Sequence, residues 1–207
     1  MRLTDRFYFA AHDDTTGRPR LHPRAVRYGL AAALLAELLY DGGITIERGH
    51  IKLIEPTTND ALSTIVLHQL RIEPLHTAVP VWLGFLAHDS PEQVARRLYR
   101  EGAVRREPYR RVIRSGSRYV PLDMNLAAWS WLDLVMKLDR GAPLEPPDVA
   151  LAGLVTATGL DGYVLAGVPA AARDRLRQLI DSATPPLRDL FAHTASAIAA
   201  GVLAYRS

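Results

Sequence analysis

Nine arginines lie between Arg96 and Arg118, and together they could bind a polyanion. The same stretch holds only two acidic residues, Glu101 and Glu107, so its formal charge is +7. Because the whole chain carries a formal charge of +3, the remainder must be −4. This asymmetry indicates a basic face directed at a negatively charged partner, either a lipid headgroup or a nucleic acid.

The basic charge is almost entirely guanidinium, since Lys52 and Lys137 are the only lysines. A guanidinium makes forked contacts with phosphate oxygens, which a lysine ammonium cannot do. A phosphate-bearing partner is therefore favoured. The candidates for an anionic-surface or headgroup site are Arg24, Arg27, Arg96, Arg97, Arg105, Arg106, Arg110, Arg111, Arg114 and Arg118.

The residue types needed for catalysis or for metal binding do not form a recognisable pattern. The chain has no cysteine, which excludes disulfides, thiolate metal sites and cysteine nucleophiles. It also lacks a phosphate-binding loop, a dinucleotide fingerprint and a nucleophile elbow. The seven histidines are scattered without ligand spacing. We therefore predict no catalytic residue, no metal and no cofactor.

The spacing of apolar residues predicts a mainly α fold with many helices. Proline and small polar residues mark helix starts, and glycines mark ends, as at Pro23 and Gly42-Gly43. The expected helices cover residues 3–11, 23–40, 60–70, 75–87, 90–101, 125–138, 148–160, 170–183 and 187–205, with a short one near 163–165. No linker divides the chain, so residues 1–207 are expected to form one compact domain.

Two small β-hairpins are expected between the helices. The first joins residues 44–46 to residues 51–54 around a turn at Arg48-Gly49. The second spans residues 103–122, is strongly basic and resembles a wing. A tight turn is expected in it at residues 115–117, where the sequence reads Ser-Gly-Ser.

The most apolar segments, residues 29–39, 149–160 and 195–205, are all shorter than the roughly 20 residues that cross a bilayer. The first residues lack the apolar stretch of a secretory signal. The absence of cysteine fits a reducing compartment. We expect a cytoplasmic protein that is peripheral at the inner face of the membrane.

The basic hairpin follows a helix that starts near Ser90-Pro91, an arrangement similar to the second half of a winged helix. In this interpretation the helix over residues 91–101 would enter a DNA groove, and the hairpin over residues 103–122 would be the wing. It requires a turn between two helices at residues 87–90. A nucleic-acid-binding protein is therefore the alternative hypothesis.

Five stretches, in this order, cover nearly the whole chain. They are Leu3-Thr4 with Phe7 to Gly17, Gly29 to Ile44, Arg97 to Val104, Ala150 to Leu160 and Arg173 to Ile180. In sequence and order they resemble the Golgi phosphoprotein 3-like family, which contains eukaryotic Golgi adaptors and many actinobacterial proteins. The resemblance implies a mostly helical, non-enzymatic adaptor that binds phosphatidylinositol 4-phosphate and attaches peripherally to membranes.

The headgroup pocket of the eukaryotic members uses one tryptophan and three arginines. Counting from Gly29 and Gly102, the corresponding residues here are His22, Ala31, His88 and Pro91, and none of them matches. Arginines nearby in the sequence, Arg20, Arg24, Arg27, Arg96 and Arg97, could supply a different anion site.

The resulting hypothesis is a non-enzymatic lipid-surface binder or adaptor whose partner is an anionic phospholipid membrane. The family's hairpin carries apolar residues that assist membrane insertion or self-association. A homo-oligomer through the basic hairpin and an unknown protein partner are further expectations.

Overall fold

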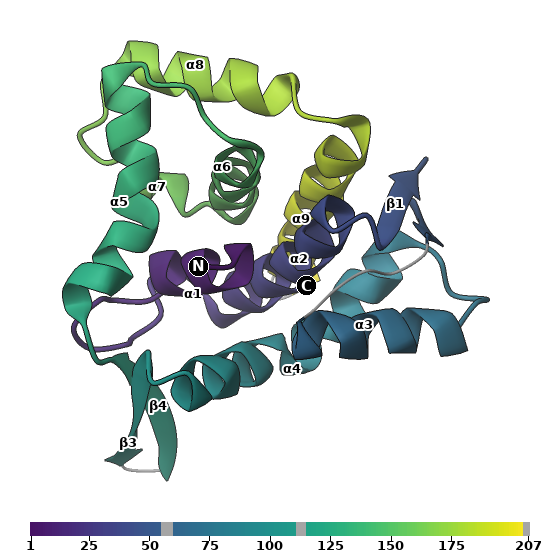
Figure 1. Cartoon of the computed structure of the whole chain (residues 1–207), viewed down its shortest axis with the longest axis horizontal. Coiled ribbons are helices and arrows are strands. Elements are labelled where there is room, and N and C mark those ends of the chain that lie inside the picture. Colours follow the sequence, from purple (N-terminus) through teal and green to yellow (C-terminus); the bar gives the residue numbers. More distant parts are fainter. Residues whose placement is uncertain (55–59, 111–114, 205–207) are drawn as a thin grey trace.

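The computed structural model describes residues 1–54, 60–110 and 115–204, and it is mainly helical (Figure 1). The helices of the described part are α1 (Leu3–Ala11), α2 (Pro23–Tyr40), α3 (Ala61–Ile72), α4 (Val79–Arg100), α5 (Met124–Arg140), α6 (Pro146–Thr158), α7 (Asp161–Val164), α8 (Ala170–Asp181) and α9 (Pro185–Ala204). The strands are β1 (Ile44–Glu47), β2 (His50–Leu53), β3 (Val104–Arg110) and β4 (Ser115–Pro121), and they form two antiparallel hairpins. The predicted fold class is confirmed.

Helix α2 lies at the centre of the fold and packs against α1, α4, α6 and α9 (Figure 1). Its residues from Leu30 to Leu38 are apolar except for Glu37, and its leucines and alanines over this stretch are fully buried. Alanines on its faces let neighbouring helices approach closely. At Gly29 an added Cβ would lie 2.2 Å from Cζ of Phe7, so only glycine allows α1 to pack here.

Helix α4 is continuous from Val79 to Arg100, so the two helices expected over residues 75–87 and 90–101 are one. Pro91 lies inside it and removes the hydrogen bond that its amide would otherwise give to the helix. Buried residues on both sides of this proline, Leu86 and Val94 among them, hold the helix together. Tertiary packing thus outweighs the local stop signal. The turn at residues 87–90 that a winged helix requires is not formed.

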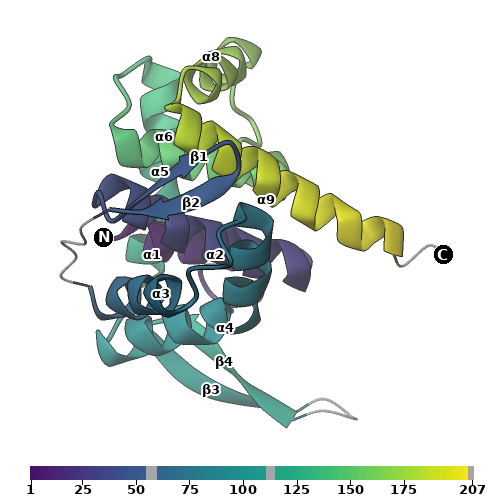
Figure 2. The same ribbon diagram turned by 90° about the vertical axis from the view of Figure 1, so that its right-hand side faces the viewer.

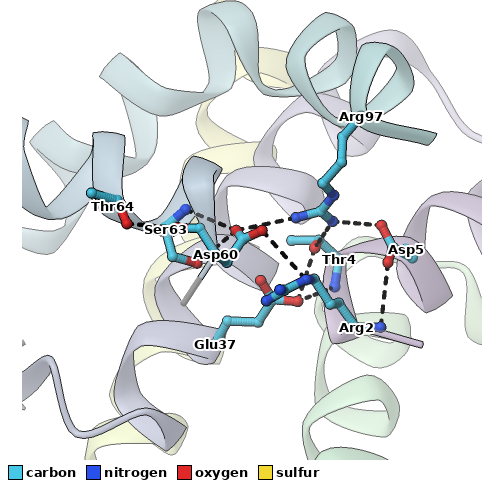
Figure 3. A network of polar contacts seen from close by, with 8 residues as sticks. All are labelled: Arg2, Thr4, Asp5, Glu37, Asp60, Ser63, Thr64 and Arg97. Atoms are coloured by element: carbon cyan, nitrogen blue, oxygen red, sulfur yellow. Dashed lines mark hydrogen bonds and ion pairs between the residues drawn. The ribbon is translucent and has the colours of Figure 1, made fainter. Parts of the chain in front are cut away.

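A buried polar network joins α1, α2, α4 and the start of α3 (Figure 3). Its centre is Arg97 of α4, whose Nη2 donates to the Thr4 hydroxyl over 2.6 Å and to the Asp5 carboxylate. Nη1 of Arg97 lies 3.3 Å from Oδ2 of Asp60. The amide and hydroxyl of Thr4 both donate to Glu37. The network ties together four segments that are distant in the sequence.

Burial and neighbouring charges shift the pKa values of the two carboxyl groups Asp60 and Glu37 in opposite directions. Burial opposes ionisation of Asp60, but the Ser63 amide and the charges of Arg97 and Arg2 lower its pKa overall. For Glu37 burial dominates and raises the pKa, although Thr4 and Arg97 work in the opposite direction. The Asp60 carboxylate is therefore favoured in its ionised form, whereas Glu37 is pushed toward its neutral form.

The first hairpin agrees with the prediction. Strands β1 and β2 pair around Arg48 and Gly49, whose φ angles are 52° and 76°. Positive φ at both central residues is the signature of a type I′ hairpin turn.

The second hairpin lies within the expected span, but residues 115–117 do not form a turn in it. Ser117 pairs with Pro108, Gly116 with Tyr109 and Ser115 with Arg110, so residues 115–117 belong to β4. The predicted tight turn at these residues is wrong. Arg111 and Arg114, two of the predicted surface arginines, lie outside the described residues.

The outer ends of β3 and β4 and the C-terminal end of α9 project toward the same side of the molecule, on the right in Figure 2. The N-terminal end of α2 lies on this side too, between these two projections. Within the described residues, every helix is too short or too polar to cross a membrane.

Candidate anion-binding site

A pocket of about 730 Å³ lies among the start of α2, the middle of α4, strand β4 and the turn that follows α1. Segments from four parts of the chain build it. The residues that line it are Tyr8, His12, Gly17, Arg18, Pro19, Pro23, Arg27, His88, Pro91, Glu92, Ala95, Ser117, Arg118 and Tyr119.

The turn after α1 forms one wall of the pocket. Oδ1 of Asp13 accepts hydrogen bonds from the amides and hydroxyls of both Thr15 and Thr16, and these bonds lower the Asp13 pKa. Gly17 has a φ of 64°, and an added Cβ would lie 2.1 Å from the Tyr119 carbonyl oxygen. Only glycine therefore allows the turn to pack on β4. This packing places the next residue, Arg18, at the pocket.

Three arginines from separate segments line the pocket: Arg18, Arg27 and Arg118. Arg18 and Arg27 are exposed, and no carboxylate of the described part of the chain forms an ion pair with them. Arg118 is half-buried, and its Nη2 lies 3.3 Å from a carboxylate oxygen of Glu107. Two of the three guanidinium groups are thus free to neutralise a bound anion.

One carboxylate shares the pocket with these cations. Oε1 of Glu92 lies 2.7 Å from Nε of Arg96 and accepts a hydrogen bond of 3.0 Å from the Tyr119 hydroxyl. Arg96 therefore compensates the charge of Glu92, and the positive charge of the pocket is kept. The carboxylate remains an acceptor for hydroxyl groups of a ligand.

The floor of the pocket is neutral. The rings of Tyr8 and His12 stack with their centroids 4.2 Å apart, and both side chains are buried. Nδ1 of His12 donates to the Tyr8 carbonyl over 2.7 Å, because a carbonyl can only accept. Burial, together with the nearby Arg20 charge, lowers the His12 pKa to about 4, and burial raises the Tyr8 pKa. Near neutral pH the pocket thus has an uncharged floor and a cationic rim.

The structure places the predicted arginines in different surroundings. Arg27 and Arg118 line the pocket, and Arg96 lies beside it through Glu92. Arg105, bound to Glu107, and the exposed Arg106 lie on β3, which Arg110 ends.

Two of the predicted arginines hold the fold together. Arg97 is buried in the polar network, so the prediction that it contacts an anionic surface was wrong. Arg24 donates from Nη2 and Nε to the Ala197 carbonyl, over 2.7 and 3.1 Å, and its guanidinium covers the Tyr28 ring. Arg24 thus anchors α9 to α2. Arg20 was also named because it is near in the sequence. Its Nη1 donates hydrogen bonds to the carbonyls of Phe9 and Ala10 at the end of α1.

The four positions identified by counting from the glycines have different surroundings. His88 and Pro91 line the pocket. His22 caps α2 by accepting from the Arg24 amide, one residue before the pocket-lining Pro23. Ala31 is fully buried within α2. Two of the four positions therefore line the pocket, and the other two do not.

Sequence reasoning missed Arg18 and the floor residues Tyr8 and His12. The turn that carries Arg18 was recognisable from Asp13 and Gly17, and its position directly after this turn was the available signal. No sequence signal places Tyr8 and His12 at a pocket rather than in the core.

Comparison with protein-family models gives a match to Golgi phosphoprotein 3 (GPP34) over residues 3–195. The chain belongs to this family. GPP34 proteins form a family of non-enzymatic adaptors. The match covers every helix except the end of α9, and it includes all the residues that line the pocket. A search of curated proteins finds no match to the chain.

Proposed function

We propose that this GPP34 protein is a non-enzymatic, peripheral membrane adaptor that binds an anionic phospholipid headgroup in the pocket between α2, α4 and β4. The observation that carries the proposal is the convergence of Arg18, Arg27 and Arg118 on one pocket. Arginine is suited to phosphate recognition through forked hydrogen bonds. The inner face of a membrane is its proposed location.

The pocket also favours a particular kind of headgroup. A neutral floor of Tyr8 and His12 can contact a ring or a polyol, whereas the rim arginines contact its phosphate. The Glu92 carboxylate can accept hydrogen bonds from hydroxyl groups. A phosphorylated polyol therefore fits better than a bare phosphate. Phosphatidylinositol 4-phosphate, implied by the family, is one such headgroup, although His22, Ala31, His88 and Pro91 differ from the eukaryotic pocket.

The remaining basic charge would support attachment from outside the pocket. Each basic residue near an anionic bilayer contributes about 1 kcal/mol, and salt screens this attraction. The exposed Arg106 of β3 is available for it, as is Arg105, although Arg105 also pairs with Glu107. Self-association through this hairpin and a protein partner remain predictions from the sequence.

Co-sedimentation with vesicles tests the proposal. Phosphatidylcholine vesicles containing phosphatidylinositol 4-phosphate or phosphatidylglycerol are compared with pure phosphatidylcholine over a salt series, with duplex DNA as a further ligand. We expect salt-sensitive binding to the anionic vesicles. Replacing both Arg18 and Arg27 by Ala should weaken it by about 2 kcal/mol.

The matched control replaces Arg140 and Arg177, two exposed arginines that do not line the pocket, by Ala. It makes the same change in net charge and should bind almost as well as the unaltered protein. Failure to bind any anionic vesicle would overturn the proposal. A strong preference for duplex DNA would favour the nucleic-acid alternative instead.

A further inference from the structure

Helix α4 exposes two large apolar side chains directly beside the pocket. Val81 is 51% exposed and Phe85 is 55% exposed, although both belong to a helix whose other face is deeply buried. In an α-helix, residues spaced by three or four lie on one face. His88 and Glu92 continue the line of Val81 and Phe85, and both line the pocket. An apolar strip and a cationic pocket are therefore neighbours on one helix face.

The Phe85 ring is held in its exposed position by a neighbour in the same helix. It meets the ring of Trp82 edge-on, with the centroids 5.5 Å apart. Trp82 is itself buried, and its Nε1 donates to the carbonyl of His76 over 2.5 Å. The tryptophan is thus fixed from both sides. Phe85 therefore packs with one edge against a buried tryptophan, and the rest of its ring is exposed.

We propose that Val81 and Phe85 form the apolar membrane contact of this protein and enter the interfacial layer of an anionic bilayer. The inference rests on the proposed headgroup function, since the adjacent cations determine which surface the strip meets. Arg18 and Arg27 at the pocket complement the negative headgroups. Side chains one turn away on the same helix face then lie against the boundary between headgroups and acyl chains.

Charge limits the depth of this contact. Asp89 is exposed and follows Phe85 by one turn, with its Oδ1 3.8 Å from Nε2 of His88. A carboxylate at this place resists entry into the hydrocarbon core. The strip is therefore an interfacial anchor, and Phe85 supplies most of its apolar area.

A second exposed apolar group provides a competing location. Leu126 and Trp129 of α5 are 45% and 54% exposed, but no residue of α5 lines the pocket. They have no adjoining cationic pocket. Such a pocket lies beside the α4 strip, and it is the reason for proposing an anionic membrane as the partner of that strip. Comparing the two groups therefore tests whether the pocket decides which surface meets the membrane.

The absence of native cysteine allows a direct test. Single variants Phe85→Cys, Trp129→Cys and Ile65→Cys are labelled with an environment-sensitive fluorophore. Ile65, 49% exposed on α3, is the matched control for an apolar residue away from the pocket. Each labelled protein is mixed with phosphatidylcholine vesicles containing phosphatidylinositol 4-phosphate or phosphatidylglycerol, and its sedimentation with the vesicles is measured in the same sample.

We expect a blue-shifted, brighter emission at position 85 and unchanged emission at positions 65 and 129. Binding without any change at position 85, or with a change at position 129 alone, would overturn the α4 contact and leave the headgroup function standing. Absence of vesicle binding by all three labelled proteins and by the unlabelled protein would overturn both.

A second measurement separates the strip from the pocket. The variant Val81→Ser, Phe85→Ser should bind anionic vesicles about tenfold more weakly, because it loses apolar burial. Its affinity for soluble glycerophosphoinositol 4-phosphate should equal that of the unaltered protein, and its thermal unfolding should be unchanged. Unaltered vesicle affinity in this variant would contradict the proposal.

Discussion

The Ser90 hydroxyl donates a hydrogen bond of 3.2 Å to the Arg27 carbonyl and so joins the middle of α4 to the first turns of α2. Ser90 is fully buried. It is followed by the pocket-lining Pro91, and Arg27 itself lines the pocket. This hydrogen bond therefore joins two helices that both contribute residues to the pocket.

Replacing Ser90 by Ala should lower the free energy of unfolding by about 1 kcal/mol, since it leaves the Arg27 carbonyl without this donor. Urea denaturation followed by circular dichroism measures the change. Ser182→Ala is the matched control: its hydroxyl also bonds a carbonyl, that of Leu179, but the residue is exposed. Equal losses in the two variants would show that the Ser90 bond has no special importance.

Arg97→Ala should destabilise the protein by about 3–5 kcal/mol, because it removes the buried cation that pairs with the carboxylates of Asp5 and Asp60. Arg97→Lys keeps the charge but loses the fork, and an intermediate loss is expected. The neighbouring Arg96→Ala removes an exposed guanidinium and should leave the urea midpoint almost unchanged. Similar midpoints for the variants at 96 and 97 would contradict the role of the network.

The contrast between Arg96 and Arg97 shows how far the sequence can predict the site. The helices and the first hairpin were predictable, because the spacing of apolar residues follows burial directly. Arg97 shares a helical face with Ser90 and Val94, both buried, so its inward orientation had a signal in the spacing. An arginine is nevertheless expected at the surface. Its burial becomes favourable only because carboxylates from three distant segments surround it, and the sequence does not show that they meet.

The pocket itself was less accessible to sequence reasoning. It depends on how the turn containing Gly17 rests against Tyr119, a contact between residues about one hundred positions apart. The continuity of α4 through Pro91 also depends on tertiary packing, which overrides local propensity.

His12 should make the protein sensitive to acid. Burial depresses its pKa from 6.5 to about 4 in the folded state, so folding favours the neutral ring. This contribution to stability is complete above pH 6.5 and is lost as the pH falls through about 4. It is on the order of 3 kcal/mol. His12→Gln should remove this part of the pH dependence, as measured by urea denaturation between these two pH values.

The exposed His68 of α3 is the control for this experiment. His68→Gln should retain the acid sensitivity of the unaltered protein. If the unfolding free energies of the His12 variant and the unaltered protein fall in parallel between pH 6.5 and 4, the depressed His12 pKa is contradicted.

Reversing the charge of the basic hairpin should abolish vesicle binding. The variant replaces Arg110, Arg111 and Arg114 by Glu, and each lost cation removes about 1 kcal/mol of attraction to an anionic surface. Co-sedimentation at low and high salt measures the effect, which should be largest at low salt because salt screens the attraction. Unchanged binding would remove the hairpin from the membrane-facing surface.

The control for the hairpin must change the net charge by the same amount at another place. Glutamate replacements of Arg140, Arg177 and Arg188 do so, and these exposed residues belong to α5, α8 and α9. Helix α8 lies at the opposite end of the molecule from the hairpin in both views (Figures 1 and 2). If attachment depends on where the positive charge lies, the control keeps most of its vesicle binding. Equal losses in both variants would mean that net charge alone drives adsorption, and the hairpin would then have no particular role.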